Sequence, residues 1–327
     1  MTTRVLVLGA SGFLGRHVIR RLAEAGGIEP VAGWHRHPPV ERAGITRVRL
    51  DASSEKALAG TLSTVDAVVN CVAGAPETIA RSGRALFRAA AAITPAPRIV
   101  HMSSMAVYGS QSGILNEDAP LLGDVGGYSE AKVAVEEAAR GYPRSICLRP
   151  GCIYGPGSTQ WSERIAKLIR AGRLGDLGAA GDGYSNLVHV DDVVAAIIAA
   201  LGAPDAPARA YNLAAQPRLR WNDYFIAYAK ALGAVPVRRI SRRQLKLESK
   251  LVAPALKVAD IVAQRVRPGN HWVPELIPPS LARLWMQEIH LDSSRAEREL
   301  GLRLTPLADG LASTLSAARD PAGASRT

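Results

Sequence analysis

The stretch VLVLGASGFLGRHVIRRL, residues 5–22, decides the fold. It opens with an apolar run typical of a buried strand and ends in a helix-like pattern. Between them, Gly9, Gly12 and Gly15 form the spacing G-x-x-G-x-x-G. Glycine permits a tight turn and close approach of a pyrophosphate, and the following helix offers free N–H groups to it. The stretch therefore predicts a dinucleotide-binding unit, although the commoner fingerprint is G-x-G-x-x-G. A glycine turn needed only for packing is the alternative interpretation.

Strand-like and helix-like segments alternate through the first half of the chain, which predicts parallel strands with helices on both sheet faces. We expect an α/β fold: a Rossmann-type doubly wound parallel sheet with a smaller, discontinuous C-terminal substrate lobe. The expected strands are residues 4–10, 30–36, 46–51, 66–74, 98–104 and 145–155, and the expected helices include 13–26, 54–62 and 77–92.

The alternation breaks after Gly155, where Pro-rich, irregular or helical stretches begin. Residues 187–215 contain a further helix and strand that return to the sheet. We expect residues 1–155 and about 187–215 to form the NAD(P)-binding domain. Residues 156–186 and 216–319 would form the substrate lobe, and residues 320–327 a loose tail.

Composition is ordinary for a globular protein, with 47% hydrophobic and 21% charged residues. No apolar run reaches the roughly 18 residues that span a bilayer, and the first residues lack a signal-peptide pattern. The three cysteines, Cys71, Cys147 and Cys152, are scattered in apolar contexts and suit reduced core residues. We expect a cytoplasmic protein without a membrane partner.

The formal net charge is +11, and much of it lies between Val235 and Met286. A nucleic-acid or anionic-membrane patch is one interpretation. The segment lacks interleaved aromatic residues and any nucleic-acid motif, which favours a solvated Arg-rich surface near an anionic substrate or cofactor. We expect a small-molecule substrate and no nucleic acid.

The end of the second expected strand indicates which nucleotide binds. The sequence VAGWHRHPP, residues 31–39, has no Asp or Glu for the ribose 2′-OH of NAD, but it has Arg36. A guanidinium pairs well with the 2′-phosphate of NADP, so we expect NADP(H) to be preferred over NAD(H). An exposed basic turn without preference is the alternative. Asp51, ending the third strand, suits either the adenine amino group or an N-cap of the next helix.

In GYSEAK, residues 127–132, Tyr128 and Lys132 are four residues apart at the start of an expected helix. Taken alone, this spacing places them only on one helix face. Further motifs follow in order along the chain: LDA, VVNCVAG, HMSSMAVYG, LRPGCIYGPG, NLVHVDDVVAAI and YNLA.

Together these motifs resemble the extended short-chain dehydrogenase/reductases, the superfamily of nucleotide-sugar epimerases and dehydratases, 3β-hydroxysteroid dehydrogenases and dihydroflavonol-type reductases. The resemblance runs from about Val5 to Ala214 and includes LDSSRAERELGLRLTP, residues 291–306. It implies that Tyr128 exchanges a proton with the substrate oxygen. Lys132 would lower the tyrosine pKa and hold the nicotinamide ribose. Ser104 would hydrogen-bond the same oxygen, with Ser103 as the second candidate.

The resemblance also implies a homodimer formed through two helices per subunit, one of them carrying Tyr128. The expected cofactor-binding residues are Gly9, Ser11, Gly12, Phe13, Leu14, Gly15, Arg36, Asp51, Ala52, Val72, Ala73, Gly74 and Lys132. The expected substrate-pocket residues are Met105, Cys152 and Arg283.

Two departures separate the chain from UDP-galactose-type epimerases. Cys152 stands where those enzymes carry an Asn that helps hold the sugar diphosphate. Ser185 and Asn186 precede HVDD, where those enzymes carry an Arg. The uncharged pair cannot neutralise a diphosphate. Arg283, near the place of another phosphate-binding Arg of those enzymes, and the Arg-rich stretch 238–267 are alternative sources of positive charge, so the epimerase interpretation stays open.

His189, Asp191 and Asp192 form a group of metal-ligand types, but in the family this stretch is structural, with an Asp capping the next helix. We expect no metal. His17 and His101 are interpreted as packed residues.

Three functions remain. The first is an NADP(H)-dependent oxidoreductase that interconverts a ketone and a secondary alcohol on a small metabolite. The second is a nucleotide-sugar epimerase or dehydratase with tightly bound, recycling NAD(P). The third is a non-catalytic NADP(H)-binding protein, which the presence of Tyr128 and Lys132 disfavours.

Overall fold

The structure is a computed structural model that describes residues 2–41, 44–204, 209–217, 219–252, 254, 256 and 274–319. The expected tail at residues 320–327 and part of the basic segment lie outside these ranges. The chain divides into two compact units. The first comprises Met1–Ile153, Val188–Ala214 and Leu291–Leu304, and the second comprises Tyr154–Leu187, Ala215–His290 and Thr305–Thr327.

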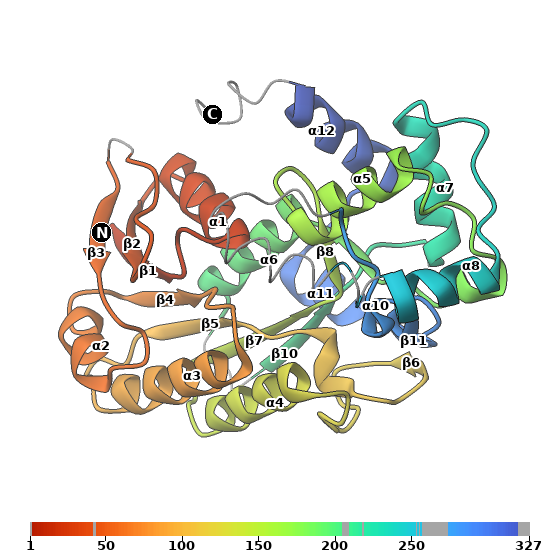
Figure 1. Ribbon diagram of the computed structural model, residues 1–327. Helices are drawn as coiled ribbons and strands as arrows, with labels where there is room; N and C mark the ends of the chain where they lie inside the picture. The colour runs from red at the N-terminus through yellow and green to blue at the C-terminus, as the bar shows by residue number, and fades with distance from the viewer. Residues whose placement is uncertain are drawn as a thin grey trace. The chain divides into compact units, whose positions relative to one another are not determined.

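The first unit contains a seven-stranded sheet in the order β10-β7-β5-β4-β1-β2-β3, and all of its neighbouring strands are parallel (Figure 1). This confirms the doubly wound α/β fold expected from the alternating segments. The strands are β1 (Thr3–Leu8), β2 (Ile28–Trp34), β3 (Thr46–Arg49), β4 (Ala67–Asn70), β5 (Arg98–Met102), β7 (Ser145–Pro150) and β10 (Arg209–Leu213).

Two hydrophobic clusters cover opposite faces of this sheet. Side chains alternate along a strand, so Val5 and Val7 of β1 belong to one cluster and Leu6 and Leu8 to the other. The first cluster packs under α1 (Phe13–Glu24), α6 (Val190–Gly202) and α11 (Ser294–Leu300). The second packs under α2 (Glu55–Leu62), α3 (Pro76–Ala91) and α4 (Gly127–Arg140).

Short elements follow β5 and β7. A 3₁₀ turn, η1 (Met105–Tyr108), and strand β6 (Gly113–Leu115) lie between β5 and α4. The expected sixth strand, residues 145–155, is wrong as one element. It ends at Pro150, and β8 (Cys152–Tyr154) begins after Gly151. The N–H of Gly151 donates to the Leu213 carbonyl, 3.0 Å away, and continues the pairing with β10 for one residue.

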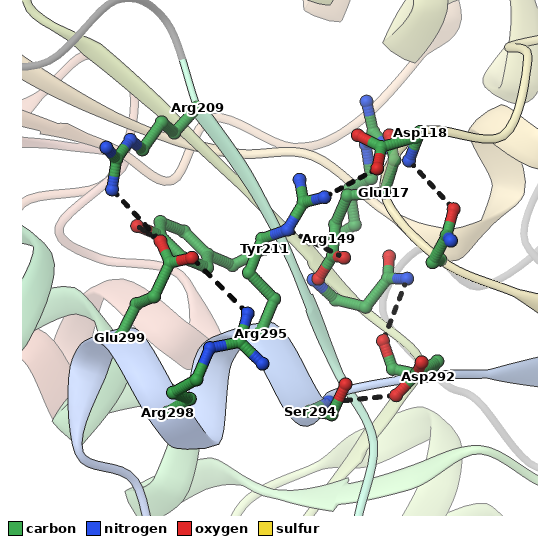
Figure 2. A network of polar contacts seen from close by, with 12 residues as sticks. Glu117, Asp118, Arg149, Arg209, Tyr211, Asp292, Ser294, Arg295, Arg298 and Glu299 are labelled. Carbon is green, nitrogen blue, oxygen red and sulfur yellow. Dashed lines mark hydrogen bonds and ion pairs between the residues drawn. The ribbon is translucent and has the colours of Figure 1, made fainter.

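Residues 291–304 were assigned to the substrate lobe from the sequence, but they belong to the first unit. Their polar contacts explain why: the Ser293 hydroxyl accepts from the Ala214 N–H at 2.8 Å, and the Asp292 N–H donates to the Leu115 carbonyl at 2.9 Å. Figure 2 shows α11 beside β10, with the Glu299 carboxylate accepting from Tyr211 and Arg209. These contacts attach the segment to the sheet edge.

The second unit has an aromatic core. Trp221 of α7 (Trp221–Ala231) stacks on Phe225 with ring centroids 5.6 Å apart, and Phe225 meets Trp285 edge-on at 5.2 Å. Its other elements are η2 (Thr159–Glu163), α5 (Arg164–Arg170), η3 (Gly178–Gly181), β9 (Leu187–His189), α8 (Arg242–Leu247), η4 (Glu248–Val252), α10 (Pro279–Leu284), β11 (Ile289–Leu291) and α12 (Leu307–Arg319). β9 and β11 each cross a boundary between the units.

Several basic side chains of the second unit have acidic partners. Arg239 pairs with Asp176, and Arg173 pairs with Glu248. The backbone around Arg238 is also fixed, because the Asp176 N–H donates to the Arg238 carbonyl at 2.9 Å. Within the basic segment, Arg239 is thus neutralised by a residue of its own unit.

Gly83 allows helices α3 and α4 to pack closely against each other. A Cβ added at Gly83 would lie 2.4 Å from Cγ2 of Val135. Val135 is β-branched and stiff in a helix, so it cannot swing away at low cost.

We predict that Gly83→Ala lowers the free energy of unfolding by about 1–3 kcal/mol, because overpacking outweighs the roughly 1 kcal/mol gained in helix propensity. Urea unfolding followed by circular dichroism measures it. Gly60→Ala in α2 is the matched control, since nothing lies within 4 Å of a Cβ there, and it should stabilise. Gly83→Ala/Val135→Ala should recover part of the loss. A Gly83→Ala variant as stable as Gly60→Ala would contradict the packing argument.

Candidate active site

The glycine turn between β1 and α1 has no room for side chains at two of its three glycines. Gly9 has φ +75°, and its Cβ would lie 2.8 Å from the Cys71 carbonyl oxygen. At Gly15 a Cβ would lie 2.2 Å from the Gly9 carbonyl oxygen. Gly12 is the N-cap of α1, and no side chain caps this helix. The turn thus presents bare backbone and free N–H groups, as a pyrophosphate requires.

The ends of the next strands lie at the same edge of the sheet as this turn, because the strands are parallel. After β4, the Asn70 side chain accepts from the Val72 N–H at 3.2 Å and contacts His101 Nδ1 at 3.2 Å. It fixes the start of the segment Val72–Gly74. Ala73 and Gly74 are exposed there, and Gly74 has φ +129°.

Asp51 follows β3, and its carboxylate accepts from the Ser53 N–H at 2.9 Å and the Ser53 hydroxyl at 2.7 Å. These hydrogen bonds lower the pKa of Asp51. The N-cap of α2 is Ser54, whose hydroxyl accepts from the Ala57 N–H. The alternative in which Asp51 caps the helix is therefore wrong, because Ser54 occupies that position.

The basic turn after β2 is exposed, including Arg36. The neighbouring His35 is close enough to Asp51 to help lower the pKa of that carboxyl group. Arg36 and Asp51 thus end neighbouring strands beside the glycine turn, where the resemblance places the adenosine ribose and the adenine.

Tyr128 and Ser104 meet at the start of α4. The Ser104 hydroxyl accepts from the Ala106 N–H at 3.2 Å and lies close enough to Tyr128 to lower the pKa of its phenol. A hydroxyl can accept and donate at once, so Ser104 can also donate its proton. The Ser129 hydroxyl donates to the Ala106 carbonyl at 2.5 Å and ties α4 to the 3₁₀ turn that Ser104 caps.

The pKa of Tyr128 is raised, mainly because protein around the phenol removes water, although the residue as a whole is 45% exposed. The hydrogen bond from Ser104 opposes this rise. The expectation that Lys132 lowers the tyrosine pKa is not met in this structure. The Lys132 Nζ lies 5.8 Å from the centroid of the Tyr128 ring and donates instead to the Met102 carbonyl at 2.6 Å.

Lys132 is buried, with 4% of its surface exposed. Burial lowers its pKa to about 8. The ammonium group is thus mostly protonated at neutral pH, but with a narrow margin.

The two serines that end β5 have different partners. The Ser103 hydroxyl donates to Glu136 Oε1 at 2.5 Å, whereas the Ser104 hydroxyl reaches Tyr128. This geometry agrees with choosing Ser104 over Ser103. Glu136 was missed, although its spacing from Lys132 repeats that of Lys132 from Tyr128 and offered a signal in the sequence.

Of the expected substrate-pocket residues, Met105 and Cys152 lie in the first unit and are buried. Cys152 adds to the rise in the Tyr128 pKa, which places it near the phenol. Burial raises the pKa of the Cys152 thiol, so it is not a reactive thiolate. Arg283 lies on α10 in the second unit and is exposed.

The HVDD stretch is a helix start, but the expected capping residue is wrong. His189 is the N-cap of α6, and its ring accepts from the Asp191 N–H. A His acceptor takes the place of the carboxylate because Asp191 and Asp192 already lie in the first helical turn. Within the described ranges, no group of three or more His, Cys, Asp or Glu side chains is arranged to hold a metal ion.

Comparison with known proteins identifies the class. Residues 5–214 match the NAD dependent epimerase/dehydratase family, and the chain belongs to this family. Two curated relatives are reductases. The 2′-dehydrokanamycin reductase of Streptomyces kanamyceticus is 28% identical over 244 residues, covering 71% of this chain and 67% of that protein. A 3-diazoavenalumate denitrifying reductase from a Streptomyces species is 28% identical over 271 residues, covering 72% of this chain and 84% of that protein.

The structural relatives include epimerases. UDP-glucuronic acid 4-epimerase from Bacillus cereus, solved with UDP-glucuronic acid and NAD, has a TM-score of 0.73 at 18% identity, over 97% of this chain and 99% of that chain. The Bordetella bronchiseptica enzyme WbmH, solved with NAD⁺, has a TM-score of 0.72 at 18% identity, over 98% and 99%. At these identities the structures establish the fold. Family and relatives together define an NAD(P)-dependent enzyme of the extended short-chain dehydrogenase/reductase type.

No helix among the residues that the structure describes is both long and apolar enough to cross a membrane.

Proposed function

We propose that the chain is an NADP(H)-dependent oxidoreductase that interconverts a ketone and a secondary alcohol on a small metabolite. The contact between Tyr128 and Ser104, with the buried Lys132 one turn along the same helix, carries the proposal. Ser104 would donate a hydrogen bond to the substrate oxygen, and Tyr128 would transfer a proton to or from it. When bound, the nicotinamide supplies or accepts the hydride at C4.

In the direction of reduction, Tyr128 would act as the proton donor. A phenol that keeps its proton at neutral pH can act as an acid toward a carbonyl oxygen. In that step the carbonyl carbon gains a hydride and its oxygen gains the tyrosine proton, so a ketone becomes a secondary alcohol. Lys132 would hold the nicotinamide ribose, and solvent would restore the proton of Tyr128.

NADP(H) as the preferred cofactor rests on Arg36. Its exposed guanidinium follows β2, where the ribose 2′-position is expected. No acidic residue lies between Val31 and Pro39 to accept a hydrogen bond from a free 2′-OH.

A nucleotide-sugar epimerase or dehydratase is the second candidate, favoured by fold similarity to enzymes solved with UDP-sugars and NAD. The second unit argues against it. Ser185 is fully buried and donates to the Leu219 carbonyl at 2.9 Å, and Asn186 donates to the Ile289 carbonyl at 2.8 Å. Both side chains are thus committed to backbone partners and carry no positive charge for a diphosphate.

The nucleotide content of the purified protein distinguishes the two candidates. The protein is purified without added cofactor and denatured, and any released NAD or NADP is identified and counted. We expect little bound nucleotide and tighter binding of NADPH than NADH on titration, because a net reductase exchanges its cofactor in every turnover. Near-stoichiometric bound nucleotide would favour the epimerase or dehydratase.

We predict that Tyr128→Phe lowers kcat/KM by about 10²–10⁴-fold, because the ring remains but the transferable proton is lost. NADPH oxidation at 340 nm with a panel of aliphatic, cyclic and aryl ketones measures it. Tyr142→Phe is the matched control. Its hydroxyl donates to the Pro97 carbonyl at 2.6 Å, at the far end of α4, so this variant should keep its turnover. Undiminished turnover in Tyr128→Phe would rule out the proton-transfer role.

We predict that Arg36→Ala weakens NADPH binding by about 10–100-fold, which corresponds to one charge-assisted contact with the 2′-phosphate. NADH binding should change little, because NADH lacks that phosphate. Fluorescence titration of both dinucleotides measures the difference. Arg21→Ala is the control, since Arg21 lies in the last turn of α1 and pairs with Glu24. Equal losses for NADPH and NADH, or a wild-type preference for NADH, would contradict the assignment.

A further inference from the structure

Glu136 lies on the same face of α4 as Tyr128 and Lys132, because four-residue steps return to one side of a helix. Glu136 and Lys132 are each 4% exposed. The proposed mechanism gives a task to Tyr128 and Lys132 but none to this buried carboxylate.

We propose that Glu136 is a positioning residue for this site: clamped by Arg149, its carboxylate supplies the negative charge that keeps Lys132 protonated at neutral pH. The importance of this charge for turnover rests on the proposed function. The charge state of Lys132 itself can be measured without any substrate.

Hydrogen bonds from Arg149 and Ser103 fix the position of the Glu136 carboxylate. Arg149 Nε donates to Oε1 at 2.9 Å, and Nη2 donates to Oε2 at 2.6 Å. The side chains of Arg149 and Glu136 are only 6% and 5% exposed. Such a bidentate pair fixes orientation as well as distance. The Ser103 hydroxyl adds a third donor, 2.5 Å from Oε1.

Ser103 connects this clamp to the catalytic groups. The preceding residue, Met102, supplies the carbonyl that accepts from Lys132 at 2.6 Å, and the following residue, Ser104, lies close enough to Tyr128 to lower the pKa of its phenol. The Met102 carbonyl accepts the hydrogen bond of the ammonium group, and Glu136 acts on Lys132 through its charge.

The other titratable groups that act on Lys132 are uncharged at neutral pH. Burial raises the pKa of Cys71, beyond β4, to about 12 and raises that of Cys147, on β7, well above its usual value. Burial and the nearby ammonium lower the pKa of His101, on β5, well below its usual value. Within the part of the chain that the structure describes, three side chains raise the pKa of Lys132: Cys71, Glu136 and Cys147. Of these, Glu136 is the one that carries a negative charge at neutral pH.

Among the elements packed against α4, β7 carries the buried cation Arg149, whose charge is paired with Glu136 and which is not among the groups that shift the pKa of Lys132. On η1, burial raises the pKa of Tyr108, so that phenol is neutral. The charged residues of α3 are exposed: Glu77, Arg81, Arg84 and Arg88. Solvent screens exposed charges much more than buried ones.

Glu117 provides a matched control within the same polar network. It is 7% exposed and accepts from the Asn212 N–H at 2.8 Å, and its backbone carbonyl accepts from Arg149 at 3.0 Å. Figure 2 shows it beside Arg295, whose Nε is 3.4 Å from its carboxylate. It does not contribute to the pKa of Lys132.

The experiment titrates Lys132 directly in the whole protein. The seven lysines are labelled with ¹³C at Cε, and Lys132 is assigned by the signal lost in Lys132→Met. We expect a wild-type midpoint near pH 8. In Glu136→Gln the midpoint should fall by about one pH unit or more, because a buried charge partner is lost. In Glu117→Gln it should stay at the wild-type value.

An unchanged midpoint in Glu136→Gln, or an equal fall in Glu117→Gln, would overturn the proposal. Should Glu136→Gln fail to fold because Arg149 is left unpaired, Glu136→Gln/Arg149→Gln removes both buried charges together. The Lys132 midpoint should still fall in that variant, and a wild-type midpoint there overturns the proposal too. Absence of ketone turnover would contradict the proposed function but leave this titration unaffected.

Discussion

Helix α4 carries a positive charge, on Lys132, that the protein keeps out of water. An ammonium group loses favourable hydration on burial, so it either releases its proton or finds compensation. Lys132 has two compensating partners: the Met102 carbonyl, which accepts its hydrogen bond, and the Glu136 charge one turn further along α4. A pKa of about 8, lowered from the usual 10.5, shows that these partners offset only part of the cost.

The partners that compensate the buried charge of Lys132 are held in place by two strands of the sheet. Met102 and Ser103 are the last residues of β5 and its extension, and the Ser103 N–H donates to the Leu148 carbonyl of β7 at 2.8 Å. Arg149, next to Leu148, is the residue that clamps Glu136. Two parallel strands therefore hold both compensating partners of one lysine. The glycine turn follows the same logic at β1: its backbone is fixed by close packing against Cys71 at the end of β4. Catalytic and nucleotide-binding groups share one sheet edge because parallel strands end together.

The sequence predicted the parts of this design that depend on local pattern. Alternating apolar runs and helix-like segments predicted the parallel sheet, and Gly9 and Gly15 predicted the turn, since their tasks need only the backbone nearby. Glu136 was missed because its task comes from Arg149 and Ser103, which α4 meets only after folding. The prediction of the N-cap of α2 was wrong for a related reason. Asp51 and Ser54 are both residue types that often cap helices. In the folded chain the Asp51 carboxylate accepts from Ser53 instead, and Ser54 caps the helix. Residues 291–304 lie far from the sheet in the sequence, and the contact of Ser293 with Ala214 assigns them to the sheet edge.

The choice between reduction and epimerisation depends on features that these shared motifs do not contain. Tyr128, Lys132 and the glycine turn serve any enzyme that moves a hydride to or from a nicotinamide, so they are equally compatible with the reductases and the epimerases among the relatives. An epimerase needs positive charge for a sugar diphosphate and must keep its cofactor through both half-reactions. In the second unit, Ser185 and Asn186 are neutral and bound to backbone carbonyls. A chain with neutral side chains at these two positions has less binding energy there with which to hold a nucleotide sugar. The neutral side chains of Ser185 and Asn186 are no obstacle to a single hydride transfer to a smaller ketone, which carries no diphosphate. This difference between the two substrates is the physical reason for preferring the reductase.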